Sequence, residues 1–134
     1  MMIKACSHLV IASSNVNEMR NFFASLFQAE PHFCNDEFCE FVLPSHFRVA
    51  FFKPVGKSSL FFSLPQDRSQ VAYGVTVENV EEIYTRALQL RLQVSGAPKE
   101  HPWGEKSFLL IDPENNRWEI AQSPSRDGML VNLD

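Results

Sequence analysis

Few polar side chains of the sequence interrupt an apolar run, where they could bind a metal or a ligand. His8 interrupts the apolar run near the N-terminus, and Glu119 interrupts the last apolar run of the chain. Both runs have the length of a β-strand, and alternate residues of a strand point to opposite faces. His8 and Glu119 are therefore expected on faces turned away from the core, where the same parity places Arg48 and Arg117. A carboxylate beside guanidinium groups can be satisfied by ion pairing alone, so Glu119 is expected to pair with Arg48 or Arg117.

The other residues of the predicted strands follow the same alternation. Leu9, Val49 and Trp118 are expected to pack inward, with their polar or small neighbours on the open side. A one-residue slip in register would exchange the two sides of a strand. The residues predicted on the open faces are His8, Val10, Arg48, Ala50, Phe52, Ala72, Gly74, Thr76, Arg117, Glu119 and Ala121.

The elements that must position these groups occur twice. Asn15 and Asn79 each begin the pattern Asn-Val-x-Glu-[Met/Ile], and 64 residues separate the two copies. An Asn followed three residues later by Glu is typical of a helix N-terminus, because the Asn side chain caps the first backbone N–H groups. Each copy follows a strand-like run and precedes an apolar stripe at helical spacing. The stripes are Val16, Met19, Phe22, Phe23, Leu26 and Phe27 in the first copy and Val80, Ile83, Tyr84, Ala87, Leu88 and Leu90 in the second.

Three short strands are predicted after each helix, which makes each copy a β-α-β-β-β unit. A four-stranded sheet with one helix has one covered face and one bare face. The predicted fold is therefore α+β, with two βαβββ modules whose mostly antiparallel, curved sheets surround a shared cleft. The predicted strands are 7–12, 31–34, 39–43 and 47–53 in the first module and 70–77, 92–95, 107–111 and 117–122 in the second.

These modules form a single predicted domain of 134 residues, with the first module at 1–53 and the second at 70–123. Residues 54–69 contain glycine, proline and several polar residues and are predicted to be a linker, within which 60–62 pack. Residues 124–134 are the predicted C-terminal tail.

The second module closes in a hairpin with a distinctive sequence. Pro113 fixes φ in the turn Asp-Pro-Glu-Asn-Asn, and Asn115 and Asn116 tolerate a positive φ. Upstream of this turn lies the tripeptide Pro-Trp-Gly at 102–104. Pro-Trp-Gly, an apolar strand and Asp-Pro-x-Asn-Asn-x-Trp-Glu together resemble the closing hairpin of the glyoxalase/bleomycin-resistance/dioxygenase superfamily, the vicinal oxygen chelate fold. Asn115 stands where this family usually has Gly.

The resemblance implies the paired-module fold over nearly the whole chain, and it also implies positions for a metal. In metal-using members of the family, ligands come from the first and last strands of each module. This rule maps the four ligand positions to His8, Ala50, Ala72 and Glu119. Only His8 and Glu119 can bind a metal there, whereas a catalytic divalent site normally has three or more protein ligands.

The missing ligands favour a protein that binds without chemistry, similar to the bleomycin-resistance branch. Such a protein would be a homodimer that holds a small organic molecule with a planar or charged portion in its clefts, with no cofactor. An aromatic ring such as that of Trp103 could stack on a flat or cationic ligand. The residues expected to line the cleft are Phe41, Arg48, Phe52, Thr76, Trp103 and Arg117, beside Glu119.

Two other functions stay open on the sequence. A metal-dependent enzyme of the glyoxalase I, fosfomycin-transferase or extradiol-dioxygenase type would use His8 and Glu119 with Ni, Zn, Mn or Fe. It needs a third ligand that the predicted register does not supply. A non-catalytic domain that only dimerises would have an apolar, filled cleft, which Arg48 and Arg117 argue against.

Composition narrows the classes of partner and compartment. A net charge of −4 argues against nucleic acid as a partner, since phosphate binding needs a basic face. No apolar run reaches membrane-spanning length, and the N-terminal residues lack the features of a signal peptide, so the cytoplasm is expected. Three cysteines without an export signal argue against a disulfide framework. These cysteines are Cys6, Cys34 and Cys39, and the remaining histidines, His32, His46 and His101, are expected in loops or at the surface.

Overall fold

The structure, a computed structural model, describes residues 1–64 and 66–123. The chain divides into two compact units at the junction of Gln66 and Asp67, which lies inside the predicted linker. The predicted C-terminal tail is outside the described residues. Within the described part of the chain, neither helix has the length and apolar character that crossing a membrane requires.

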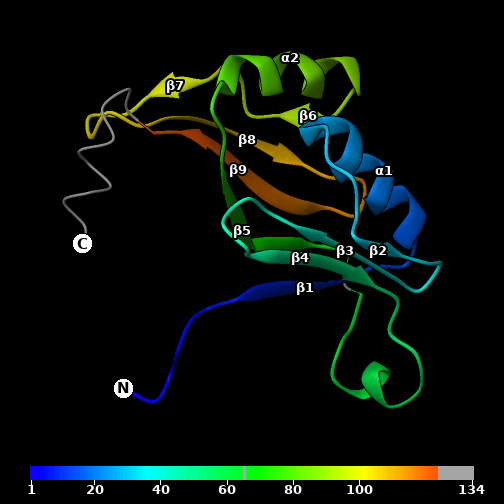
Figure 1. Cartoon of the computed structure of the whole chain (residues 1–134). Helices are drawn as coiled ribbons and strands as arrows, with labels where there is room; N and C mark the ends of the chain where they lie inside the picture. Colours follow the sequence, from blue (N-terminus) through cyan, green and yellow to red (C-terminus); the bar gives the residue numbers. More distant parts are fainter. Residues whose placement is uncertain (65, 124–134) are drawn as a thin grey trace. The chain divides into compact units, whose positions relative to one another are not determined.

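The first unit is one helix on a four-stranded sheet, followed by a short 3-10 helix (Figure 1). The sheet has the strand order β1-β4-β3-β2, in which β1 and β4 are parallel and the other neighbours are antiparallel. Its elements are β1 (His8–Ala12), α1 (Val16–Phe27), β2 (Phe33–Cys34), β3 (Phe38–Val42), β4 (Arg48–Phe52) and η1 (Gly56–Leu60).

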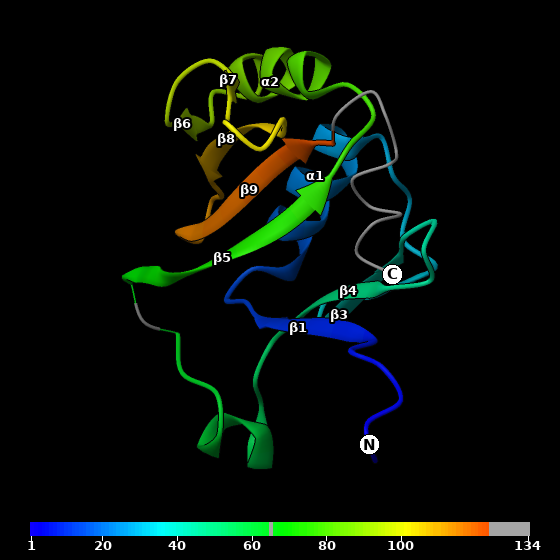
Figure 2. The same cartoon turned by 90° about the vertical axis from the view of Figure 1, so that its left-hand side faces the viewer.

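The second unit repeats this arrangement with a longer first strand. Its sheet has the order β5-β9-β8-β6, and Figure 2 shows the parallel pair β5 and β9 side by side. An additional two-residue strand, β7, pairs with β8 and was not predicted. The elements are β5 (Arg68–Thr76), α2 (Val80–Gln89), β6 (Gln93–Val94), β7 (Lys99–Glu100), β8 (Lys106–Ile111) and β9 (Asn116–Gln122). The predicted α+β fold of two βαβββ modules is confirmed.

Both helices begin where the repeated motif predicts. The Asn15 side chain accepts a hydrogen bond from the backbone N–H of Glu18 at 3.0 Å, and Asn79 accepts one from Glu82 at 3.2 Å. Each contact satisfies one of the backbone donors that a helix N-terminus leaves without an intrahelical partner. The cap therefore fixes the point at which the chain leaves the first strand of each module and starts its helix.

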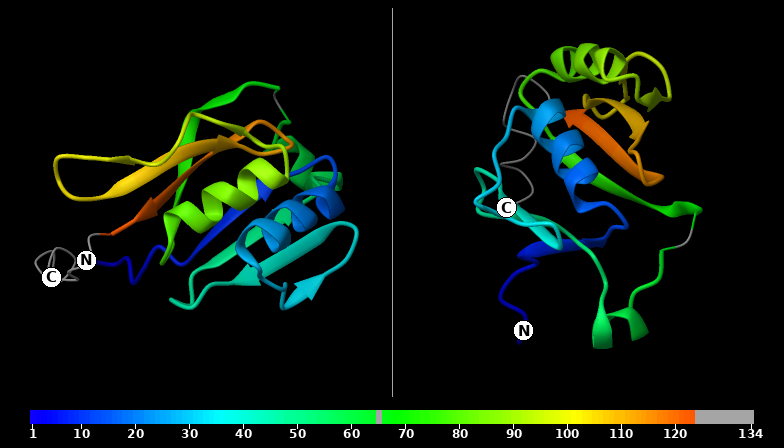
Figure 3. Two further views of the ribbon diagram at one scale, coloured as in Figure 1. Left: turned by 90° about the horizontal axis from the view of Figure 1, so that it is seen from above. Right: turned by 90° about the vertical axis from the view of Figure 1, so that its right-hand side faces the viewer.

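Helix α1 covers one face of the first sheet, where it contacts β3 and β4 (Figure 3). The Phe23 ring lies 4.5 Å from the Phe41 ring and 5.9 Å from the Phe51 ring, measured between centroids. Phe41 is 1% exposed and lies opposite Val49, a residue of the helix-covered face. The prediction that Phe41 lines a ligand site is wrong, because Phe41 shares the strand parity of the core.

Helix α2 covers the second sheet along a narrower stripe than the sequence predicts. Val80, Ile83 and Ala87 are buried, whereas Leu88 is 49% exposed and Leu90 is 41% exposed. Leu88 comes directly after the buried Ala87, so its side chain points to a different side of the helix. Leu90 follows the last helical residue, Gln89. The expectation that these two leucines join the core is wrong.

The hairpin between β8 and β9 is built around a buried carboxylate. Asp112 is 3% exposed, and its Oδ2 accepts hydrogen bonds from Trp118 Nε1 and Asn116 Nδ2, both at 2.8 Å. Its Oδ1 accepts the backbone N–H groups of Glu114 and Asn116 at 2.8 and 3.0 Å. Asn115 has a φ of 69°, the left-handed conformation that the turn sequence predicts. The motif residues of this hairpin are therefore explained by the architecture of the turn.

Candidate functional site

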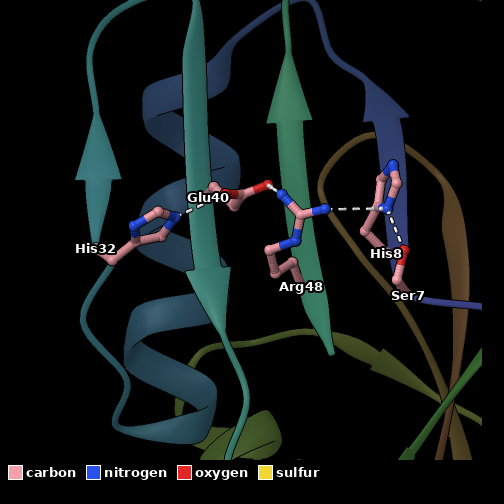
Figure 4. A network of polar contacts seen from close by, with 5 residues as sticks. All are labelled: Ser7, His8, His32, Glu40 and Arg48. Carbon is pink, nitrogen blue, oxygen red and sulfur yellow. Dashed lines mark hydrogen bonds and ion pairs between the residues drawn. The ribbon is translucent and has the colours of Figure 1, made fainter. Parts of the chain in front are cut away.

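A chain of polar contacts crosses the open face of the first sheet, opposite α1 (Figure 4). His32 Nε2 lies 2.6 Å from Glu40 Oε1, and Arg48 Nη1 lies 3.5 Å from Glu40 Oε2. The other terminal nitrogen of Arg48, Nη2, lies 3.2 Å from His8 Nδ1, which is also 2.8 Å from Ser7 Oγ. We call these five residues, Ser7, His8, His32, Glu40 and Arg48, the open-face network.

The strand register explains why the central members meet. His8 on β1 lies directly opposite Arg48 on β4, and Glu40 on β3 lies opposite Ala50. Arg48 and Ala50 are two residues apart on one strand and so share a face, which puts Glu40 on the diagonal from Arg48. Glu40 is only 8% exposed, and a buried carboxylate is stable only with charged or hydrogen-bonding partners. His32 and Arg48 supply those partners from either side.

Arg48 is held in place and is still accessible. Its side chain is 42% exposed, while the Glu40 side chain is 10% exposed. A guanidinium group has five N–H donors in a planar fork, which matches the geometry of carboxylate and phosphate groups. Contacts to Glu40 and His8 fix its orientation before a ligand arrives. Arg48 can therefore donate to an oxygen acceptor without first losing the freedom of a surface arginine.

The contact between Arg48 and His8 also determines how the imidazole can act. A guanidinium only donates hydrogen bonds, so a hydrogen bond from Arg48 makes His8 Nδ1 an acceptor and puts the proton of the neutral ring on Nε2; the Ser7 hydroxyl, which can donate or accept, then donates to the same atom. A histidine that binds a metal through Nε2 instead donates its Nδ1–H to an acceptor. The partner of His8 therefore has the wrong polarity for a metal ligand of this kind.

The residues at the family's metal positions do not fit a chelated ion. In the first unit His8 is accompanied by Ala50, and in the second Glu119 is accompanied by Ala72, so each unit offers one donor and one methyl group. Among the described residues, no group of three or more His, Cys, Asp and Glu side chains could hold a metal. Structural and catalytic sites normally use at least three protein ligands.

On the open face of the second sheet, Arg117 and Glu119 do not form the predicted ion pair. The guanidinium of Arg117 donates instead to the backbone carbonyl of Asn115 in the adjoining turn. Glu119 is exposed, opposite Gly74 and Leu109, and takes part in no salt bridge within residues 1–64 and 66–123. Arg48, the other predicted partner, has Glu40 as its carboxylate.

The remaining predicted site residues lie in separate places. In the second unit, Trp103 is 55% exposed and stacks on His101, with centroids 4.6 Å apart and an interplanar angle of 3°. His101 Nε2 is 2.8 Å from Ser107 Oγ, which steadies this stack. Thr76 is exposed at the end of β5. In the first unit, Phe52 packs edge-on against Phe62 with centroids 4.7 Å apart, so part of its ring is covered.

Three members of the open-face network, Ser7, His32 and Glu40, were not predicted as site residues from the sequence. Glu40 carried a signal, since it is a single acidic residue between Cys39 and Phe41 in a predicted strand, and strand parity puts it on the open face. His32 lies just before β2, although the predicted strand 31–34 includes it, and its contact with Glu40 depends on the path of the loop there.

Comparison with known proteins identifies the family. A sequence model of the Glyoxalase/Bleomycin resistance protein/Dioxygenase superfamily matches residues 5–120. A search of curated proteins gave no significant match.

Several solved structures share the fold at low sequence identity. A glyoxalase-related enzyme from Fulvimarina pelagi is 17% identical with a TM-score of 0.76, over 90% of this chain and 89% of that one. The fosfomycin resistance protein FosX from Listeria monocytogenes is 19% identical with a TM-score of 0.72, over 92% and 97%. Lactoylglutathione lyase from Agrobacterium tumefaciens is 16% identical with a TM-score of 0.69, over 91% and 96%. Because the family match spans most of the sequence and these structures share its architecture, the chain belongs to the Glyoxalase/Bleomycin resistance protein/Dioxygenase superfamily.

Proposed function

We propose that this protein binds a small organic molecule through the open-face network of its first unit, without a chelated metal. The ligand carries an oxygen acceptor group, such as a carboxylate or a phosphate-type group, that accepts hydrogen bonds from Arg48. The observation that carries the proposal is an arginine whose two terminal nitrogens are already oriented by Glu40 and His8 while 42% of its side chain stays exposed.

The surroundings of Arg48 support recognition of a ligand that has both polar and apolar parts. Val10 and Val42 lie on the same face of the sheet and are 39% and 45% exposed. Apolar groups beside a few fixed polar donors are typical of small-molecule sites, where the polar groups set orientation. The proposed ligand therefore places its acceptor group at Arg48 and its carbon skeleton over these valines.

The donor set supports binding in preference to metal chemistry. Two of the four family ligand positions are alanine, and His8 Nδ1 faces a hydrogen-bond donor. A divalent ion at the pair of positions in the first unit would have His8 as its protein ligand there, and an ion at the pair in the second unit would have Glu119. Such a site would hold metal weakly compared with sites that have three or more ligands.

We also propose that the protein is a homodimer. The segment around η1 supports a contact surface, since Leu60 is 80% exposed and Phe61 is 84% exposed. Exposed apolar side chains of this size that adjoin each other are typical of protein interaction sites. Light scattering during size-exclusion chromatography tests this: the parent should elute as a dimer, and Phe61→Ser should shift it toward monomer. A parent that stays monomeric at high concentration would contradict the dimer.

Ligand binding is tested by screening a panel of small organic carboxylates and phosphates against the full chain. A thermal shift screen selects compounds, and titrations followed by ¹H–¹⁵N correlation spectra then locate the site. We expect shifts at His8, Glu40 and Arg48. Arg48→Lys keeps the charge but loses the planar fork, so the affinity should fall by about tenfold or more, or at least about 1.4 kcal/mol.

Arg20→Lys is the matched control, because Arg20 is an exposed arginine of helix α1, which covers the other face of the same sheet, and its guanidinium donates to the neighbouring Asn21. This variant should bind like the parent. The proposal is wrong if no compound of either class shifts the three network residues, or if Arg48→Lys binds every selected compound as tightly as Arg20→Lys.

A further inference from the structure

Two of the three cysteines lie directly opposite each other across the hairpin formed by β2 and β3. Cys34 is paired with Cys39 in the antiparallel register. The turn closes through a hydrogen bond from the Asn35 backbone N–H to the Phe38 carbonyl at 2.8 Å, so residues 35 and 38 are a hydrogen-bonded pair. Pairs alternate along an antiparallel ladder, and Cys34 and Cys39 are therefore a non-hydrogen-bonded pair, in which side chains approach more closely.

This placement satisfies the geometry of a disulfide. Non-hydrogen-bonded pairs have Cα atoms about 4.5 Å apart, and disulfides bridge Cα atoms about 4.4 to 6.8 Å apart. Directly opposite residues of a ladder also point to the same face, and the nearness of Cys34 is one of the causes that raise the pKa of the Cys39 thiol. A bond between the two sulfur atoms therefore needs a change of side-chain torsion and little movement of the backbone.

The two thiols differ in a way that assigns their roles. Cys39 is fully buried, and burial, followed by its contact with Cys34, raises the pKa of the Cys39 thiol to about 12. Cys34 lies at the sheet edge and is partly exposed. Because the thiolate is the reactive form, Cys34 is the thiol that an oxidant reaches first, and Cys39 is placed to react with the product.

We propose that Cys34 and Cys39 form a reversible disulfide that is made by hydroperoxides and broken by small thiols. The Cys34 thiolate attacks the outer oxygen of the hydroperoxide, an S–O bond forms, the O–O bond breaks and an alcohol, or water from hydrogen peroxide, leaves. The Cys39 sulfur then attacks the Cys34 sulfur, the S–O bond breaks, and the hydroxide leaves as water with the Cys39 proton. In total two thiols lose two electrons and two protons, and the hydroperoxide is reduced by the same two electrons.

The disulfide would act on the hairpin that carries part of the open-face network. Glu40 follows Cys39 in β3, and His32 comes two residues before Cys34. Strand β2 has only two residues and lies at the edge of the sheet. Oxidation would therefore tie this short strand to β3 beside the contact between His32 and Glu40.

Mass spectrometry of the full chain tests the proposal. The folded protein is treated with limiting hydrogen peroxide, the remaining thiols are alkylated, and the protein is digested without reduction. We expect the peptides of Cys34 and Cys39 to be joined, with loss of two hydrogen atoms, and dithiothreitol to restore both thiols. The same treatment in urea is the control for a disulfide that forms only in the unfolded chain.

Three variants assign the steps. Cys6→Ser should form the disulfide as the parent does, because Cys6 lies outside the hairpin. Cys39→Ser should accumulate a sulfenic acid at Cys34 that dimedone traps, whereas Cys34→Ser should leave Cys39 as a thiol. The proposal is overturned if Cys34 oxidises to sulfinic acid while Cys39 stays free in the parent, if the product is a bond between chains, if Cys6 alone reacts, or if the bond between Cys34 and Cys39 forms only in urea.

Discussion

The buried carboxylate of the β8–β9 hairpin gives the sharpest prediction about stability. Asp112→Ala removes the acceptor of four hydrogen bonds, two from side chains and two from the backbone of the turn. The two side-chain donors belong to Trp118, which is 0% exposed, and Asn116, which is 1% exposed. Water cannot easily replace the carboxylate at such buried donors. The variant therefore loses the free energy that it costs to keep these donors away from water without an acceptor.

The magnitude follows from this burial. A buried donor that loses its acceptor costs about 1–3 kcal/mol, and hydrogen bonds to a charged group lie toward the upper end. Two such donors make the expected loss about 3–5 kcal/mol in the free energy of unfolding of the second unit. This is a large share of the stability of a typical domain, which is about 5–15 kcal/mol. Asp112→Asn keeps one acceptor oxygen and should lose less.

Urea unfolding followed by tryptophan fluorescence is a suitable assay, because both tryptophans of the chain belong to the second unit. The fluorescence signal therefore comes from this unit. Glu100→Ala is the control, since it removes an exposed carboxylate from the short strand β7 of the same unit. The reasoning is refuted if Asp112→Ala lowers the stability by less than about 1 kcal/mol, the range of ordinary surface changes.

Three further predictions concern the first unit. Phe41→Ala should lower its stability by about 3–5 kcal/mol, measured by urea unfolding with circular dichroism, because Phe41 is a core residue; unchanged stability would contradict this. Nitrogen-15 shifts of the imidazole should show neutral His8 with its proton on Nε2, and Arg48→Gln should release this preference; a ring protonated on Nδ1 in the parent would contradict the arrangement. Alkylation of Cys39 should stay slower than that of Cys34 between about pH 8 and pH 10, because the raised pKa of Cys39 keeps it a thiol there; equal rates would contradict its burial.

The fold could be predicted because its signals are local and repeated. Asn15 and Asn79 mark two helix starts through hydrogen bonds to residues only three positions further along the chain. The turn at Asn115 depends only on the backbone conformation of that residue. Strand parity then separates the covered face from the open face once the register is known. Strand β7 was missed because two polar residues, Lys99 and Glu100, carry no alternation.

The site was harder to predict because its contacts join separate strands. Parity places Arg48 and His8 on the open face, but the partner of Arg48 is Glu40 on the neighbouring strand β3, and parity within one strand does not show which residues of two strands meet. Phe41 was expected to line the cleft, but it is paired with Val49 and so lies on the helix-covered face. Arg117 and Glu119 share a face, yet the arginine side chain reaches a nearer acceptor in the turn. Same-face placement thus does not determine which pair forms.

Elemental analysis of the protein purified without chelators tests most directly whether the chain holds a chelated metal. We expect Ni, Zn, Mn and Fe contents well below one ion per chain, with no difference between the parent, Glu119→Gln and the control Glu100→Gln. A near-stoichiometric content of one of these metals in the parent and in Glu100→Gln, lost in Glu119→Gln, would contradict this expectation and favour a metal-dependent enzyme.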